Sequence, residues 1–153
     1  GHVGEDVAHR VLVLAAVAIH GIGCVSCTEI GCDSGVDVTV DGFSPAVQGK
    51  LPAAIKICVG ADCQSYTVSE ANGALSCTAD TTGSQCSVSD GGTLKAFFYG
   101  ETQGEIDVSV EVKDSAAAVV FTDSTTVEIT ESKPNGDQCE PTCHVGAASL
   151  TIP

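Results

Sequence analysis

Tryptophan and methionine are absent from this sequence, and aromatic residues are few. The aromatic side chains are four Phe and two Tyr, so most of a hydrophobic core must come from Val, Ile, Leu and Ala. Because these side chains bury less apolar area than aromatic rings, burial alone stabilises such a domain less. The chain has 153 residues, which suits one domain with a small core. Covalent cross-links would therefore help to stabilise it.

Basic residues are also scarce. Six Lys and Arg stand against 20 Asp and Glu, which gives a formal net charge of −14. Negative charge repels a phosphate backbone, so we expect no nucleic-acid partner. The acidic residues are scattered along the chain, as on a solvated surface that keeps a protein soluble. An alternative use for Asp80, Asp90 and Asp137, which fall in predicted loops, is weak binding of Ca²⁺.

The sequence motifs of common enzyme families are missing. The sequence contains no GxSxG, no HExxH and no glycine-rich phosphate loop. His144 is the one histidine after residue 23, and no motif pairs it with a nucleophile. We therefore expect a protein without enzymatic activity and without a cofactor. A secreted enzyme with an unrecognised site is the alternative.

The N-terminal segment has the layout of a secretory signal. Arg10 precedes an uninterrupted apolar run at residues 11–19, and small residues follow it up to Cys24. A membrane span needs about 20 apolar residues, and this run is shorter. We predict a signal peptide over residues 1–23, with a buried strand or helix as the alternative. Because the sequence has no methionine, we expect residue 1 not to be the initiator, and Val7 is a candidate non-ATG start.

Cysteine is abundant, and the number of cysteines, nine, is odd. Cys24 ends the sequence GIGC, which resembles the lipobox of bacterial lipoproteins, although Gly21 stands where leucine is usual. If Cys24 carries the lipid, an even number of cysteines remains for disulfides. We predict lipidation at Cys24, with Cys27 as a second candidate. Residues 24–33 are then a tether between the anchor and a domain over residues 34–153.

The other eight cysteines are predicted to form four disulfides, because exported chains oxidise their thiols. They are Cys27, Cys32, Cys58, Cys63, Cys77, Cys86, Cys139 and Cys143. The full connectivity cannot be deduced from sequence. Proximity suggests Cys58 with Cys63 or Cys77, and Cys77 with Cys86. Cys32, near the first strand, could reach Cys139 or Cys143 near the last.

Two alternatives to disulfides use the same cysteines. The spacings around Cys27, Cys32, Cys139, Cys143 and His144 resemble those of zinc ligands. Cys24 and Cys27 form a CxxC motif, which in another context would indicate redox chemistry. Oxidation in an exporting compartment competes with zinc, and no predicted helix follows the CxxC to lower the pKa of a thiol. Disulfides are therefore favoured, and we expect no metal site.

Apolar and polar residues alternate with a period of two along the rest of the chain. Asn72-Gly73 indicates a tight hairpin, with Leu75-Ser76-Cys77 after it. Residues 78–92 are polar and indicate a loop, and no segment shows convincing helical periodicity. The predicted strands cover residues 36–40, 54–59, 65–68, 94–99, 106–112, 117–122, 126–130 and 148–152. Seven or eight short strands predict an all-β, antiparallel sandwich, with a closed barrel as the alternative.

Residues 134–143 read PNGDQCEPTC and precede the last predicted strand. This segment resembles the motif PNGPxCxPxC of small lipoproteins of myxobacteria and their relatives, although Asp137 stands in place of a proline. Those proteins also have a cysteine soon after the lipobox and a cysteine-flanked turn midway, matched here by Cys32 and by Cys63 and Cys77. The resemblance implies an immunoglobulin-like or similar sandwich on the cell envelope. It implies no known activity and carries over no functional residue.

Together these features predict a function in binding. We expect a lipid-anchored domain on the outer membrane or surface of a bacterium, or otherwise a secreted one. It would bind a protein or a glycan through its loops. An alternative is a structural subunit of an extracellular filament or coat, in which strands of neighbouring chains pair. In that case Val11–Ile22 would persist as the joining element.

Overall fold

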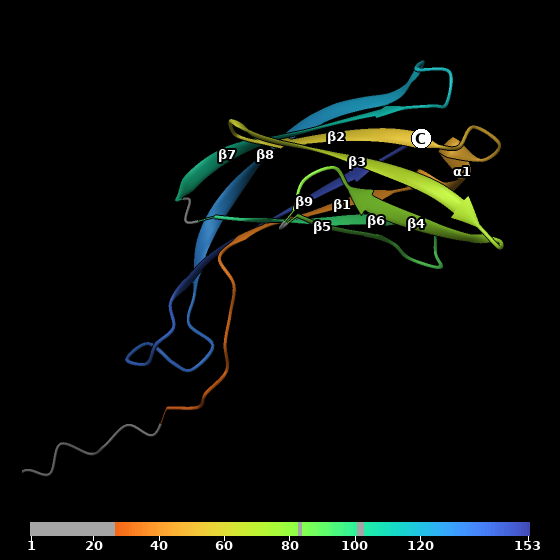
Figure 1. Cartoon of the computed structure of the whole chain (residues 1–153). Coiled ribbons are helices and arrows are strands. Elements are labelled where there is room, and N and C mark those ends of the chain that lie inside the picture. The colour runs from red at the N-terminus through yellow and green to blue at the C-terminus, as the bar shows by residue number, and fades with distance from the viewer. Residues whose placement is uncertain (1–26, 83, 101–102) are drawn as a thin grey trace, which may run out of the picture.

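The computed structural model describes residues 27–82, 84–100 and 103–153. The predicted signal peptide and Cys24 lie outside these residues. The described part of the chain folds into nine strands and one short helix (Figure 1). In chain order the elements are β1 (Gly35–Asp41), α1 (Phe43–Val47), β2 (Ala53–Val59), β3 (Asp62–Ala71), β4 (Ala74–Ala79), β5 (Gln85–Val88), β6 (Leu94–Tyr99), β7 (Gly104–Lys113), β8 (Val119–Ser132) and β9 (Cys143–Thr151).

The strands form one nearly closed sheet in the order β4-β3-β2-β7-β8-β9-β1-β6-β5. The strands at the two ends of this order, β4 and β5, lie side by side. The prediction of an all-β fold is confirmed. The prediction that the sheet is antiparallel throughout is wrong for one pair, because β1 and β9 run parallel. The first and last strands both start from the same end of the sheet, where two disulfides join the segments that lead into them.

The longest strand, β8, changes partner along its length. Residues 119–129 pair with β7, whereas residues 130–132 pair with β9. The sequence predicted two strands here, separated by Asp123-Ser124-Thr125. That prediction is wrong because these three residues continue the ladder with β7 while their side chains face solvent or are half-buried. A strand that is exposed in its middle lacks the apolar alternation on which the prediction depended.

Three further elements differ from the predictions. β4 and β5 extend into residues 78–92, which were predicted as a loop. No side chain of either strand is fully buried, and the inward positions include only a few apolar residues, so their alternation is weak in the sequence. The five-residue helix α1 follows the predicted turn at Asp41-Gly42 and is too short to show a helical period. In the described residues, no helix is long and apolar enough to cross a membrane.

The interior of the sheet is filled mainly by aliphatic side chains. In β1 and β7 the alternation predicted from sequence places valines inside, while Asp37, Ser109 and other polar side chains face outward. Phe43 of α1 is fully buried, and α1 lies at the end of the sheet opposite the stalk. No charged side chain of the described residues is buried. The largest fully buried side chains are Tyr66, Phe43, Ile55, Ile57 and Leu94.

Four disulfides cross-link the fold, and they pair all eight cysteines of the described residues. They are Cys27–Cys139, Cys32–Cys143, Cys58–Cys63 and Cys77–Cys86. Cys77–Cys86 is the predicted pair, and Cys58–Cys63 and Cys32–Cys143 are each one of two predicted options. Because the cysteines of the zinc alternative are bonded to one another, their thiolates are not available as ligands. Disulfides form and persist in oxidising surroundings, so the four bonds indicate an extracytoplasmic compartment.

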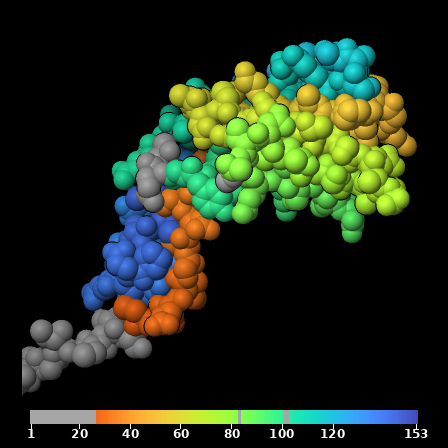
Figure 2. Space-filling model, in the orientation of Figure 1, coloured from red at the N-terminus to blue at the C-terminus, as the bar shows by residue number. Residues whose placement is uncertain are grey.

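A narrow lobe projects from one end of the sheet (Figure 2). It consists of residues 27–34, which lie along residues 133–142, and we call this lobe the stalk. Cys27–Cys139 and Cys32–Cys143 bond the two segments to each other and to the start of β9. Part of the segment that the sequence predicted as a tether is therefore cross-linked to the domain.

One side chain holds the stalk together between its disulfides. The amide oxygen of Asn135 accepts hydrogen bonds from the hydroxyl of Thr28, at 2.6 Å, and from the backbone N–H of Ile30, at 2.9 Å. Its amide nitrogen donates to the backbone carbonyls of Ile30 and Glu140, both at 2.8 Å. Asn135 thus uses both lone pairs and both N–H groups of its side chain.

Candidate functional site

Strand β6, whose last residue pairs with the first residue of β1 at the stalk end of the sheet, carries three aromatic residues in succession. Phe98 points into the core with Leu94 and Ala96, because alternate side chains of a strand face opposite sides. Phe97 and Tyr99 therefore lie on the outer face. The chain has six aromatic residues, counting four Phe and two Tyr, so this strand holds half of them.

On the outer face, Phe97 and Tyr99 form an aromatic pair. Their ring centroids are 4.6 Å apart and the rings meet at 72°, which is the edge-to-face geometry favoured by aromatic quadrupoles. Tyr99 is 48% exposed, whereas Phe97 is half-buried. Tyr99 is the one aromatic side chain among the exposed large hydrophobic residues of the described chain.

Glycine at position 35 makes room for this pair. Gly35 lies opposite Tyr99 in the ladder between β1 and β6. A Cβ atom at Gly35 would lie 2.8 Å from two carbon atoms of the Phe97 ring, which is closer than side chains pack. The Phe97 ring therefore lies against the backbone of Gly35, and in turn it supports the ring of Tyr99.

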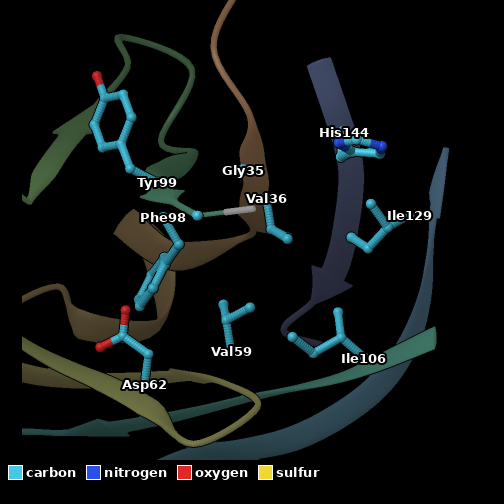
Figure 3. Close-up of a pocket in the computed structure, with 10 residues that line it drawn as sticks. Gly35, Val36, Val59, Asp62, Phe98, Tyr99, Ile106, Ile129 and His144 are labelled. Carbon is cyan, nitrogen blue, oxygen red and sulfur yellow. The ribbon is translucent and has the colours of Figure 1, made fainter. Parts of the chain in front are cut away.

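A cavity of about 190 Å³ opens behind Tyr99, at the stalk end of the sheet (Figure 3). Phe98 and four aliphatic side chains form much of its wall, and Asp62, Tyr99 and His144 are its titratable members. The carboxylate of Asp62 points toward the Phe98 ring, whereas the hydroxyl of Tyr99 points away from the cavity. The lining residues come from β1, β2, β3, β6, β7, β8 and β9 and are Gly35, Val36, Val59, Asp62, Phe98, Tyr99, Gly100, Ile106, Ile129 and His144.

A second hollow, of about 170 Å³, adjoins the first. Both hollows are lined by Asp62, Phe98 and Tyr99, so Tyr99 borders each of them. The second adds side chains with hydroxyl or amide groups, Gln64, Thr82 and Ser84, together with Phe97. We call the residues of the two hollows the Tyr99 site.

Hydrogen bonds orient the polar side chains of the Tyr99 site. The amide nitrogen of Gln64 donates to the carboxylate of Asp62 at 3.0 Å. The amide oxygen of Gln64 accepts a hydrogen bond from the hydroxyl of Thr81. This chain of contacts holds the Asp62 carboxylate beside the aromatic pair, with oxygen lone pairs left to accept from a ligand.

A part-buried hydrogen bond orients Ser84, which lines the second hollow. The hydroxyls of Tyr66 and Ser84 lie 2.6 Å apart, and Tyr66 is almost completely buried. Burial raises the pKa of Tyr66 above its ordinary value of 10.0; the hydrogen bond to Ser84 lowers this pKa and the negative charge of Asp62 raises it. The Tyr66 hydroxyl is therefore neutral near physiological pH and positions Ser84.

His144 lies at the stalk side of the first hollow. Its Nε2 is 3.7 Å from a carboxylate oxygen of Glu131 and 3.3 Å from the amide nitrogen of Gln103. The hydroxyl of Ser34 accepts a hydrogen bond from the backbone N–H of His144.

The structure separates the residues that the sequence suggested for calcium. Asp80 directly follows β4, Asp90 lies in the turn between β5 and β6, and Asp137 lies in the stalk. Within the described ranges, no group of three or more His, Cys, Asp and Glu residues could hold a metal ion.

Two larger and shallower hollows lie at the end opposite the stalk, around α1. Their volumes are about 550 and 390 Å³, and they share Gly49, Leu51, Glu70 and Gly73. Neither is lined by an aromatic side chain. The Tyr99 site combines an exposed ring with oriented polar groups and is therefore the stronger candidate.

The sequence did not predict the Tyr99 site. Residues 94–99 were correctly predicted as a strand, but no functional role was assigned to Phe97 or Tyr99. The signal that could have indicated it is the run of three aromatic residues in a chain otherwise poor in them. The predicted site residues lie elsewhere: the disulfide cysteines are in the fold and the stalk, and Cys24 is outside the described residues.

Comparison with known proteins found no matching family model, no matching curated protein and no matching solved structure. The geometry and chemistry of the Tyr99 site therefore carry the functional argument.

Proposed function

We propose that this protein is a non-enzymatic binding module of the bacterial cell envelope, with the Tyr99 site as its ligand site. The observation that carries the proposal is the exposed ring of Tyr99, held edge-on by Phe97 between two hollows. A tyrosine has few rotatable bonds, and this one is already supported, so ordering it on binding costs little entropy. Tyrosine also offers a large contact area together with a polar hydroxyl.

The disulfides support the proposed location. Four disulfides favour an oxidising compartment, in which such bonds form and persist. We propose that a lipid on Cys24 anchors it to the envelope. Cys27, the other candidate for lipidation, bonds Cys139, and this favours Cys24 as the acylated residue. Eight of the nine cysteines are paired with one another, which leaves Cys24 without a cysteine of the same chain to bond.

The finer description of the fold is also a proposal. The sheet divides at β8 into two halves, β9-β1-β6-β5 and β7-β2-β3-β4, and β8 joins both. This division supports an immunoglobulin-like sandwich, with the core between the halves. The contact of β4 with β5 gives the same molecule a barrel-like closure.

Envelope binding tests the ligand site directly. A Cys24→Ser background removes the proposed anchor, so sedimentation with bacterial envelopes then reports only binding by the folded domain. We expect this protein to co-sediment with envelopes, and Tyr99→Ala to lower the bound fraction at least tenfold. Val119→Ala is the matched control, because Val119 is 51% exposed and lies at the opposite end of the sheet. Equal sedimentation of Tyr99→Ala and the parent protein would contradict the proposed site.

Intact-mass analysis of the native protein tests the anchor separately. The expected mass corresponds to a chain that begins at Cys24, carries acyl groups and lacks eight cysteine hydrogens because of four disulfides. The Cys24→Ser/Tyr99→Ala protein, which lacks both the anchor and the ligand site, should move from the membrane fraction to the soluble fraction. A native chain that retains residues 11–22 would overturn the anchor.

A further inference from the structure

We propose that the ligand of the Tyr99 site is a neutral carbohydrate chain laid across the Tyr99 ring. This inference rests on the proposed function, because it assigns a chemical class to the ligand of the same site. Three features carry it: the supported ring, the hydroxyl and amide groups beside the ring, and the absence of Lys and Arg from the described residues that line the two hollows.

The ring of Tyr99 suits the apolar face of a sugar. The axial C–H groups on one face of a pyranose are weakly positive, and they pack against the negative face of an aromatic ring. Phe97 contacts Tyr99 at an interplanar angle of 72°, so it steadies the ring without stacking on it. Gly35 permits this arrangement because it has no side chain in the space that the Phe97 ring occupies.

The polar groups of the site match vicinal hydroxyls. A sugar hydroxyl both donates and accepts, so it pairs with a carboxylate or amide oxygen on one side and an N–H or hydroxyl on the other. Asp62 supplies a carboxylate whose position is set by Gln64 at 3.0 Å. Thr82 and Ser84 supply hydroxyls on the same side of Tyr99.

Charge selects among carbohydrates. Among the described residues, the lining of the two hollows includes Asp62 and no Lys or Arg, and the chain has a formal net charge of −14. A polymer with carboxylate, sulfate or phosphate groups would be repelled. Asp62 is exposed, so salt would screen its attraction for a cation such as an amino sugar. A neutral ligand is not repelled by the negative charge, and its binding does not depend on an ion pair that salt would screen.

The size of the hollows favours a chain over a small enclosed molecule. Pockets that enclose a small molecule usually exceed about 300 Å³, whereas the two hollows here have about 190 and 170 Å³. They adjoin each other at Tyr99. Successive sugar units of one chain can therefore lie in the two hollows, with the ring of Tyr99 between them.

Affinity electrophoresis in gels that contain a polysaccharide tests the inference. The probes are dextran, galactomannan and laminarin, which are neutral, and alginate, which is anionic. The Cys24→Ser protein with its four disulfides should be retarded by at least one neutral polysaccharide and not by alginate. Tyr99→Ala and Asp62→Ala should each weaken the apparent affinity at least tenfold, whereas Tyr99→Phe should retain most of it. Val119→Ala should behave like the parent protein, and circular dichroism checks that each variant is folded.

The outcomes separate the two proposals. If no neutral polysaccharide retards the protein but envelope binding still depends on Tyr99, the carbohydrate class is overturned and the binding site stands. Retardation by alginate that depends on Tyr99 overturns the charge argument. If neither envelope nor polysaccharide binding depends on Tyr99, both the ligand class and the proposed site are wrong.

Discussion

Cys77 in β4 is bonded to Cys86 in β5, with their Cα atoms 5.7 Å apart, and this bond joins the two strands at the ends of the sheet. Neighbouring strands in a sheet lie about 4.8 Å apart, so a strand inserted between β4 and β5 would separate them to about 10 Å. The bond does not permit that separation. It therefore closes the sheet and also keeps a foreign strand out of this seam.

Removal of this bond is expected to weaken the protein and open the seam. The bond spans nine residues in sequence, and the chain-entropy model gives about 2–3 kcal/mol for so short a loop. We expect a Cys77→Ala/Cys86→Ala protein to lose about this much free energy of unfolding in urea and to self-associate in light scattering. The matched control is Cys58→Ala/Cys63→Ala, which removes a bond within one hairpin and opens no seam. Equal self-association of the two variants would contradict the role given to Cys77–Cys86.

The two stalk disulfides are expected to act non-additively. Cys27–Cys139 and Cys32–Cys143 span 112 and 111 residues, so each closes almost the same large loop. With one present, the other closes only a small additional loop, and its removal should cost about 3 kcal/mol. Removal of both opens the large loop as well and should cost about 5 kcal/mol more than a single removal. Urea unfolding of the two single-pair variants and the double-pair variant measures the difference, and strictly additive costs would refute it.

Asn135 offers a local test of the stalk. In Asn135→Asp the two N–H donors are lost, and a carboxylate faces the backbone carbonyls of Ile30 and Glu140. Unpaired carbonyls facing a carboxylate should destabilise this contact by about 1–3 kcal/mol. Hydrogen exchange of residues 27–33 should become faster, while exchange in β2 and β7 stays the same. Gln138→Glu makes the same chemical change at an exposed neighbour and should leave the exchange unchanged.

Tyr66 gives the protein a dependence on alkaline pH. Its pKa is raised above 10.0 in the folded state, mainly because the side chain is buried. A raised pKa means that folding favours the protonated hydroxyl. The associated stability is complete below the pKa of the unfolded chain and is lost as pH rises through the pKa of the folded state. The free energy of unfolding should therefore fall as pH rises above 10.0, and it should fall less in Tyr66→Phe.

The titration of Tyr66 can be followed alone. The chain has two tyrosines, so Tyr99→Phe leaves Tyr66 as the one phenol. Phenolate absorbance in that variant should show a midpoint above 10.0 when folded and a lower midpoint in concentrated urea. Identical midpoints in the two conditions would show that burial does not perturb Tyr66.

Several strands could be predicted from the sequence because each buries one face. β6 was predicted to the residue, and β1, β2 and β7 to within one or two residues at each end. Their inward positions are Val, Ile, Leu or another apolar residue, so alternation and burial coincide. β4, β5 and the middle of β8 were not predicted as strands, because few of their side chains are both apolar and buried.

The candidate site could not be predicted because its residues meet only through the topology. Gly35, Asp62, Tyr99 and His144 come from four strands, and no local pattern connects them. Exposure of Tyr99 also depends on its place at the end of β6, where the neighbouring strand contributes a glycine. Disulfide pairing was partly predictable for a related reason. Cys58 and Cys63 are close in sequence, whereas the bond between Cys27 and Cys139 depends on how the stalk folds.

The cross-linked stalk has a mechanical consequence. Tension applied at residue 27 passes through Cys27–Cys139 and Cys32–Cys143 to β9, as well as along the backbone to β1. Because β1 and β9 are parallel neighbours and start at the same end, both strands are pulled in the same direction. A force on the N-terminal side of the stalk is thus divided between the first and last strands, and it does not slide one strand past the other. A domain held by its N-terminal end against flow or a bound polymer would keep its sheet intact under traction.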